Sequence, residues 1–274
     1  RELLAVILGI FISLFIMFAV FAIAVSVLSS SFSSEDIVEV KNNSILTLEL
    51  EEDIKDFAPK SDDPFASLLD FKDEKIGLNE MINAIENAKS DDRIKGISIE
   101  ALEISGGISQ MQSLRNKLLE FKETGKFIYA FADMYTQKNY YLSSVADSLF
   151  VNPVGGIDFK GLSAEMYYFK DFQDKYGIKM EVIRHGKYKS AVEPFLSNTM
   201  SEENKEQTAS FLHSIWNEVI KDIGFSKNKS NEELNKIADS LMARNPELAV
   251  ANGMVHGAVY KDQYRNKLKE RVGV

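Results

Sequence analysis

The chain has 274 residues, a formal net charge of −9 at pH 7 and no cysteine. The acidic balance argues against a nucleic-acid partner, because phosphates would repel it. The lack of cysteine excludes disulfides, thiol catalysis and cysteine-ligated zinc.

The chain opens with an uncharged apolar run, Leu3–Leu28. This run is longer than the roughly 20 residues that a helix needs to cross a bilayer core. It also lacks the small-residue cleavage step of a signal peptide, although a long signal peptide is the alternative. We therefore predict a transmembrane anchor and polar spacer over residues 1–34 and one domain over residues 35–274. The acidic segment Glu35–Asp63 favours a domain outside the cytoplasm.

Strand and helix patterns alternate through the first half of the domain. A strand is expected at Ile45–Leu50, and the charged segment Asp53–Lys75 reads as an exposed loop. Further strands are expected at Ile94–Ile99, Phe127–Ala132 and Ser148–Val151, and helices at Leu78–Ile85, Ile108–Phe121 and Tyr140–Val145. This alternation predicts an α/β fold with parallel strands and flanking helices.

The second half continues the same pattern. A helix at Phe169–Tyr176 is followed by an expected strand at Lys179–Arg184, and Ser201 begins a long helix. Two more helices are expected at Glu232–Leu241 and Lys261–Lys269.

The segment Gly186–Phe195, GKYKSAVEPF, follows the expected strand directly. Catalytic groups gather at the carboxyl ends of strands in α/β sheets, so Lys189 is a candidate general base. A lysine acts as a base only where its surroundings keep it neutral, and Tyr188 and Val192 are compatible with an apolar pocket. The alternative is an exposed surface lysine.

The segment Gly186–Phe195 resembles the signal peptide peptidase A (protease IV) family. Shorter stretches that support the resemblance are Lys95–Ile97, Gly125–Lys126, Tyr140–Leu142, Ala146–Asp147 and Gly161–Leu162. That family is peptidase family S49 of the Clp protease/crotonase superfamily. The resemblance is to the N-terminal half of the double-length bacterial form. It implies a Clp/crotonase-like fold and a serine peptidase that degrades cleaved signal peptides at the inner (cytoplasmic) membrane. It also implies a homotetramer, with a Ser–Lys dyad in which this half supplies Lys189 and a C-terminal half the serine.

The missing nucleophile agrees with that division. Short relatives carry an Ala-Ser-Gly-Gly-Tyr-type motif, and the matching stretch here, Thr136–Tyr140, has Gln137 in place of the serine. An amide cannot be activated as a nucleophile by a neighbouring base. Ser143 and Ser144 are interpreted as ordinary helix residues. The alternative function is therefore a non-catalytic, membrane-anchored module that binds peptides or scaffolds a partner.

Other polar residues are weaker candidates. Gly106 and Gly107 match the family's Gly-Gly stretch, whose N–H groups stabilise an oxyanion; in this half a substrate-groove or structural role is expected. Glu193 is expected to form a surface ion pair or to contact a neighbouring subunit, and Ser190 to cap a turn. The apolar segment Met166–Phe169 is expected in the core, or else along a peptide channel. The three histidines lack metal-ligand spacing, so no metal or cofactor is expected.

Overall fold

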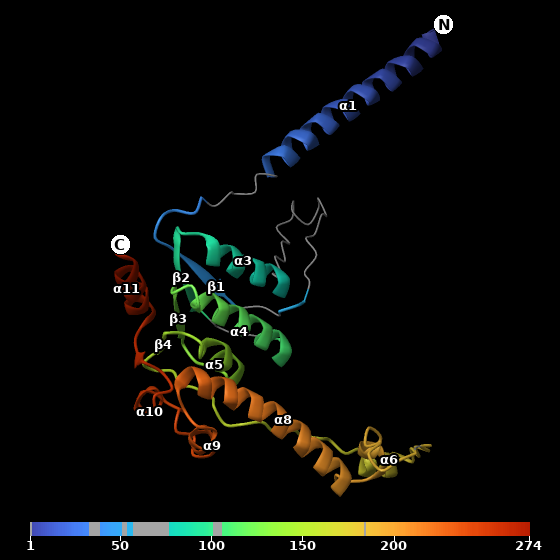
Figure 1. The fold of residues 1–274 in the computed structure, drawn as a ribbon. Helices are drawn as coiled ribbons and strands as arrows, with labels where there is room; N and C mark the ends of the chain where they lie inside the picture. The colour runs from blue at the N-terminus through green and yellow to red at the C-terminus, as the bar shows by residue number, and fades with distance from the viewer. Residues whose placement is uncertain (1, 33–38, 51–53, 57–76, 101–105, 184) are drawn as a thin grey trace.

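The computed structural model describes residues 2–32, 39–50, 54–56, 77–100, 106–183 and 185–274. Its centre is a parallel five-stranded sheet in which the strands follow one another in chain order (Figure 1). The strands are β1 (Ser44–Glu49), β2 (Ile94–Glu100), β3 (Phe127–Ala132), β4 (Ser148–Val151) and β5 (Gly257–Ala258). The predicted α/β fold with parallel strands and flanking helices is confirmed.

Helices precede, connect and follow the strands of the sheet. They are α1 (Glu2–Phe32), α3 (Leu78–Ser90), α4 (Ile108–Lys122), α5 (Gln137–Ser143), α6 (Lys170–Tyr176), α7 (Glu193–Leu196), α8 (Glu202–Lys227), α9 (Asn231–Asp239), α10 (Pro246–Ala251) and α11 (Lys261–Val272). In Figure 1, α3, α4, α5 and α8 lie on one side of the sheet and α11 on the other.

Alternation along β3 explains why both faces of the sheet are covered. Ile128 and Ala130 belong to the large core formed with α3, α4, α5 and α8. The intervening Phe127 and Phe131 belong to a smaller cluster closed by Tyr264 of α11. Successive side chains of a strand point to opposite faces, so this aromatic and aliphatic strand is buried on both sides.

The predicted strand at Lys179–Arg184 is wrong. Residues 179–183 have no regular structure, and residue 184 lies outside the described residues. A strand needs a neighbour for its backbone hydrogen bonds. The place beside β4 is taken instead by β5, a two-residue strand that the sequence pattern did not reveal. Lys189 consequently does not follow a strand of the sheet.

The N-terminal run forms α1, which continues to Phe32 and so includes part of the predicted spacer. The side chains described for it, residues 7–23, are mostly exposed and apolar. Across the described residues, no helix is both long and apolar enough to cross a membrane. The predicted transmembrane helix is not confirmed.

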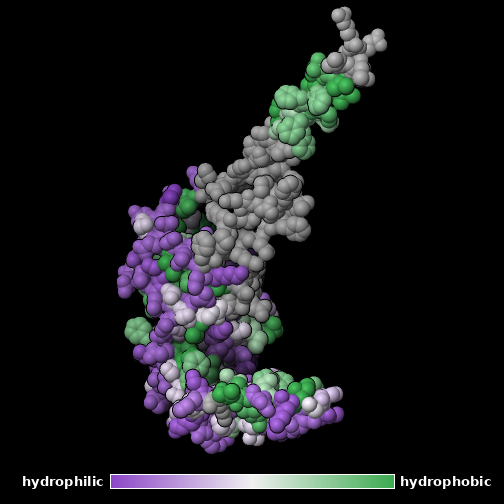
Figure 2. Space-filling model, turned by 90° about the vertical axis from the view of Figure 1, so that its right-hand side faces the viewer, coloured by the Kyte–Doolittle hydropathy of each residue, from purple (hydrophilic) through white to green (hydrophobic). Residues whose placement is uncertain are grey.

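Residues 162–201, here called the arm, leave the sheet and return to it through α8. Figure 1 shows α6, which belongs to the arm, beside the first turns of α8 and away from the sheet. Apolar side chains gather on this projecting part of the molecule, at the bottom of Figure 2. Large exposed examples are Tyr167, Phe169, Phe172, Tyr176, Ile178 and Ile183. The arm therefore presents an apolar surface outside the core.

Candidate active site

Lys189 lies in the arm, in the loop between α6 and α7, and its side chain is exposed. It lines a cavity of about 550 Å³ whose wall is formed by the loop itself and by the segment before it. The other lining residues are Val182, Ile183, His185, Tyr188, Ser190, Ala191 and Val192. The expected apolar surroundings are present, but within this chain they do not bury the lysine.

The backbone of this loop is shaped at both ends. Gly186 adopts a φ of +97°, a conformation that side chains disfavour, and begins the turn before Lys189. The N–H of Glu193 donates to the carbonyl of Ser190 at 2.9 Å, which closes a turn directly after the lysine. Pro194 lies in the first turn of α7, where the lack of an N–H has no cost. Lys189 is therefore held between two defined turns.

Glu193 is not the surface residue that the sequence suggested. Only 5% of it is exposed, so it does not lie on the surface of this chain. Its carboxylate accepts hydrogen bonds from the Ser201 hydroxyl, from the Ser201 N–H at 3.3 Å and from Asn204 Nδ2 at 2.9 Å. The Ser201 hydroxyl in turn caps α8 by accepting from the Asn204 N–H at 3.2 Å. The segment that carries Lys189 is thus bonded to the start of α8.

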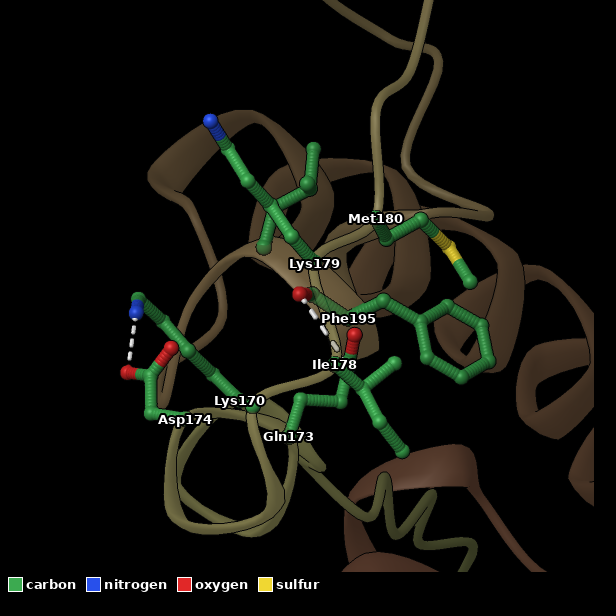
Figure 3. A pocket seen from close by; sticks show the side chains of 9 residues that line it. Lys170, Gln173, Asp174, Ile178, Lys179, Met180 and Phe195 are labelled. Carbon is green, nitrogen blue, oxygen red and sulfur yellow. Dashed lines mark hydrogen bonds and ion pairs between the residues drawn. The ribbon is translucent and has the colours of Figure 1, made fainter.

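Helix α6 supports the same segment from the other side. The Phe169 N–H donates to the Pro194 carbonyl at 2.6 Å, and Gln173 Nε2 donates to the Phe195 carbonyl at 3.3 Å. The rings of Phe169 and Phe195 stack with centroids 5.8 Å apart. Beside these contacts is a second cavity of about 450 Å³, and Figure 3 shows Ile178, Met180 and Phe195 among the residues that line it.

The apolar segment Met166–Phe169 is not core. Tyr167 is 74% exposed and Phe169 is 45% exposed, so the core interpretation is wrong for these two residues. Their position on the arm leaves the channel alternative open. The hydroxyl of Tyr168, in contrast, is buried and has no hydrogen-bond partner among the described residues.

Gln137 occupies the first position of α5, behind the capping residue Thr136. Its Oε1 accepts hydrogen bonds from the N–H groups of Lys160 at 3.1 Å and Gly161 at 3.0 Å. Its Nε2 donates to the Gly161 carbonyl at 3.0 Å. The side chain at the nucleophile's expected place therefore joins α5 to the start of the arm, and it has no nucleophilic atom.

The two serines near Gln137 are structural. Ser143 and Ser144 are fully buried, and Ser144 Oγ accepts a 2.7 Å hydrogen bond from Arg115. Arg115 is itself 1% exposed and joins three helices. Its remaining acceptors are the carbonyls of Tyr141 and Asp222 and the hydroxyl of Ser226. The sequence analysis missed this arginine, because it stands in an ordinary amphipathic helix.

Gly106 and Gly107 precede α4 in the sheet domain, and Gly107 is the capping residue of that helix. The N–H of Gly107 donates to Gln110 Oε1 at 2.8 Å, and the carbonyl of Gly106 accepts from Lys138 at 2.9 Å. The Gly107 donor is thus engaged within the chain, which favours the structural role. The arm lies away from α4 in Figure 1, so the fold does not bring these glycines to Lys189.

No group of three histidine, aspartate or glutamate side chains among the described residues is placed to hold a metal ion. His256 serves the fold, because its Nδ1 accepts a 2.9 Å hydrogen bond from the Leu149 N–H. Burial and the nearby Lys227 lower the pKa of His256.

The family model for peptidase family S49 matches residues 120–274, more than half of the chain. The chain belongs to peptidase family S49. The matched region includes Gln137, Lys189 and Glu193, whereas Gly106 and Gly107 precede it. A parallel sheet with flanking helices also fits the Clp/crotonase-like fold that the resemblance implied.

Individual S49 relatives are longer than this chain. Protease 4 of Haemophilus influenzae is 35% identical over 161 residues, which is 58% of this chain and 26% of that protein. Protease 4 of Salmonella typhi is 32% identical over 162 residues, 59% of this chain and 26% of that protein. The chloroplastic serine protease SPPA of Arabidopsis thaliana is 27% identical over 235 residues, 86% of this chain and 33% of that protein. The chain thus spans about a quarter to a third of these relatives.

Proposed function

We propose that this S49 chain is the base-bearing part of a serine endopeptidase that degrades cleaved signal peptides through a Ser–Lys dyad. Lys189 is the general base, and a C-terminal half of the protein supplies the serine. The relatives named Protease 4 and Serine protease SPPA support the activity. The proposal rests on two features that occur together in this chain. Lys189 lies in a loop shaped by two turns, and Gln137 stands where the nucleophile is expected.

The chemistry requires more than this chain provides. A serine hydroxyl attacks a peptide carbonyl only if a base accepts its proton, and a lysine does this only when it is neutral. Neutral lysines are desolvated, whereas Lys189 is exposed here. We therefore infer that the site is completed when the rest of the enzyme, or a second subunit, covers the arm. The exposed apolar side chains of the arm support such a cover.

The test compares this chain with the complete enzyme on a peptide ester. The chain alone should be inactive, and the complete enzyme active. Lys189→Ala should abolish activity of the complete enzyme while leaving its melting temperature within about 1–2 °C, since an exposed side chain contributes little to stability. Lys187→Ala in the same loop is the matched control and should retain activity. Activity in Lys189→Ala would refute the base assignment.

We also propose that the protein is a homotetramer attached by α1 to the inner membrane, with the domain of residues 35–274 outside the cytoplasm. The uncharged run Leu3–Leu28 and the exposed apolar side chains of residues 7–23 support attachment. Carbonate extraction of membranes tests it, with a variant lacking residues 1–34 as the control. The homotetramer is tested by analytical ultracentrifugation of the complete enzyme without residues 1–34, which measures the mass of the assembly.

The alternative is a non-catalytic module that binds peptides or a partner, and the observation in its favour is Gln137 itself. Its amide oxygen accepts from the N–H groups of Lys160 and Gly161, and its amide nitrogen donates to the Gly161 carbonyl. If the gene encodes no Ala-Ser-Gly-Gly-Tyr-type motif after residue 274, this alternative replaces the peptidase.

A further inference from the structure

We propose that Glu193 is the positioning residue of the Lys189 loop. Its buried carboxylate fastens the loop to the first turn of α8, and thereby sets where the lysine is presented. The inference rests on the proposed function for its catalytic consequence, because the group that is positioned is the proposed base. The anchoring itself is a property of this chain and is tested separately.

The Glu193 carboxylate is buried and is held by hydrogen-bond donors of the protein. A carboxylate that is 5% exposed is costly unless hydrogen bonds replace its water. Among the described residues, three donors do so: the Ser201 N–H, the Ser201 hydroxyl and Asn204 Nδ2. All three come from the start of α8, so the contact joins two segments of the chain and cannot form unless the loop is in place.

The end of α8 is suited to this carboxylate. The first N–H groups of a helix have no partners within it, and the helix dipole favours negative charge there. Helix α8 has 26 residues, and its first turn also carries Glu202 and Glu203. Glu202 is exposed and Glu203 is half-buried, whereas Glu193 is buried and its carboxylate contacts the capping residue Ser201. Burial and the charge of Glu193 together raise the pKa of Tyr168, against the opposing effect of Lys205.

The contact between Glu193 and α8 is close enough to Lys189 in the chain to influence the position of the lysine. The Glu193 N–H bonds to the Ser190 carbonyl at 2.9 Å, so a shift of Glu193 moves the residue that follows the lysine. At its other end, α8 is fixed in the core by Ile220 and Ile223. Glu193 therefore connects a projecting loop to a helix that is rigidly packed in the domain. A displacement of about 1 Å in a reacting group lowers a rate by about 100-fold, which makes such a connection matter for catalysis.

Hydrogen exchange on this chain tests the anchor. Glu193→Gln, which keeps the size and removes the charge, should speed exchange in peptides covering residues 185–201 by at least about tenfold. Peptides from β3 and α11 should be unchanged. Glu202→Gln removes a charge from the first turn of α8, the turn that Glu193 contacts, and leaves the loop unchanged. This variant should exchange at the wild-type rate. Equal exchange in Glu193→Gln and wild type overturns the proposal. If Glu193→Gln fails to fold, Asn204→Ala removes one donor and gives the same comparison.

Kinetics of the complete enzyme test the positioning role. Glu193→Gln should lower kcat by about 10–100-fold with KM changed less than about threefold, and should move the acid limb of the kcat/KM profile. Glu193→Asp should recover part of kcat, and Glu202→Gln should retain all of it. Unchanged kcat and pH profile in Glu193→Gln overturn the proposal, provided that Lys189→Ala is inactive. If Lys189→Ala is active, the proposed function fails, and hydrogen exchange still decides whether Glu193 anchors the loop.

Discussion

Gln137 and Gly161 form a two-way pair between a side chain and the backbone: Gln137 Oε1 accepts from the Gly161 N–H, and Gln137 Nε2 donates to the Gly161 carbonyl, both at 3.0 Å. Gly161 has a φ of +89°, which an L side chain rarely adopts. The pair therefore fixes a positive-φ backbone turn where the chain leaves the domain for the arm. Gln137 thus has a structural task within this chain.

Gln137→Ala should destabilise the chain by about 1.5–4.5 kcal/mol, because a hydrogen bond contributes about 0.5–1.5 kcal/mol and three are lost. Gln137→Glu should cost less, since a carboxylate still accepts from the N–H groups of Lys160 and Gly161. Urea unfolding measures both, with Lys138→Ala on the exposed neighbouring position as the control. A Gln137→Ala variant as stable as Lys138→Ala would contradict this role.

Gln137→Ser should not create a peptidase in this chain. The hydroxyl would stand at the start of α5, whereas Lys189 is exposed on the arm, which lies away from the sheet in Figure 1. A serine without a base in reach remains a poor nucleophile. The measurement is hydrolysis of a peptide ester by Gln137→Ser and by the same variant with Lys189→Ala. Turnover that appears in the first and is lost in the second would show that one chain suffices.

Arg115→Ala should cost about 3–5 kcal/mol of stability, the range for breaking a buried charged network. Its guanidinium donates to the carbonyls of Tyr141 at 2.5 Å and Asp222 at 2.6 Å, and to the hydroxyls of Ser144 and Ser226. These contacts join α4 to α5 and α8, so truncation leaves several buried acceptors unpaired.

Arg115→Lys should recover little of this loss, because a compact ammonium cannot reach acceptors on both helices in the way that a planar guanidinium does. Arg265→Ala, on the exposed face of α11, is the control for loss of an arginine and should change stability by less than about 0.5 kcal/mol. Denaturant midpoints distinguish these outcomes. If Arg115→Lys matches the wild type, the fork geometry is unimportant.

Patterns within one element were sufficient for most of the fold. The sequence predicts Ser201 as a helix cap because its hydroxyl accepts from the N–H three residues later. It predicts β3 because the aromatic and β-branched residues of that strand are consecutive. The strand expected at Lys179–Arg184 is absent over the described residues 179–183, and the sequence does not show that the two-residue strand β5 takes the place beside β4. The surface position expected for Glu193 is wrong because its partners Ser201 and Asn204 belong to the next helix, α8. The sequence pattern does not show that α8 packs against Glu193 and buries it.

Lys227 should make the chain more stable as the pH rises above about 8. Its Nζ is buried without a hydrogen-bond partner among the described residues, and burial, Lys122 and Arg115 lower its pKa to about 8, against the opposing effect of Asp147. Between about pH 8 and the unfolded value near 10.5, the folded state has lost the proton and the unfolded state still binds it. The unfolded state then binds more protons, so the free energy of unfolding increases with pH in this window.

Lys227→Met removes the buried charge and keeps an unbranched apolar stem. It should raise stability at pH 7 by an amount on the order of 1–3 kcal/mol and abolish the gain between pH 8 and 10. Lys221→Met, on the exposed face of the same helix, should keep the wild-type profile, which corrects for the titration of other lysines and tyrosines. Melting temperatures at half-unit pH steps provide the measurement. Parallel profiles for Lys227→Met and wild type would mean that the Lys227 ammonium is solvated in the folded chain, and that its burial does not limit stability.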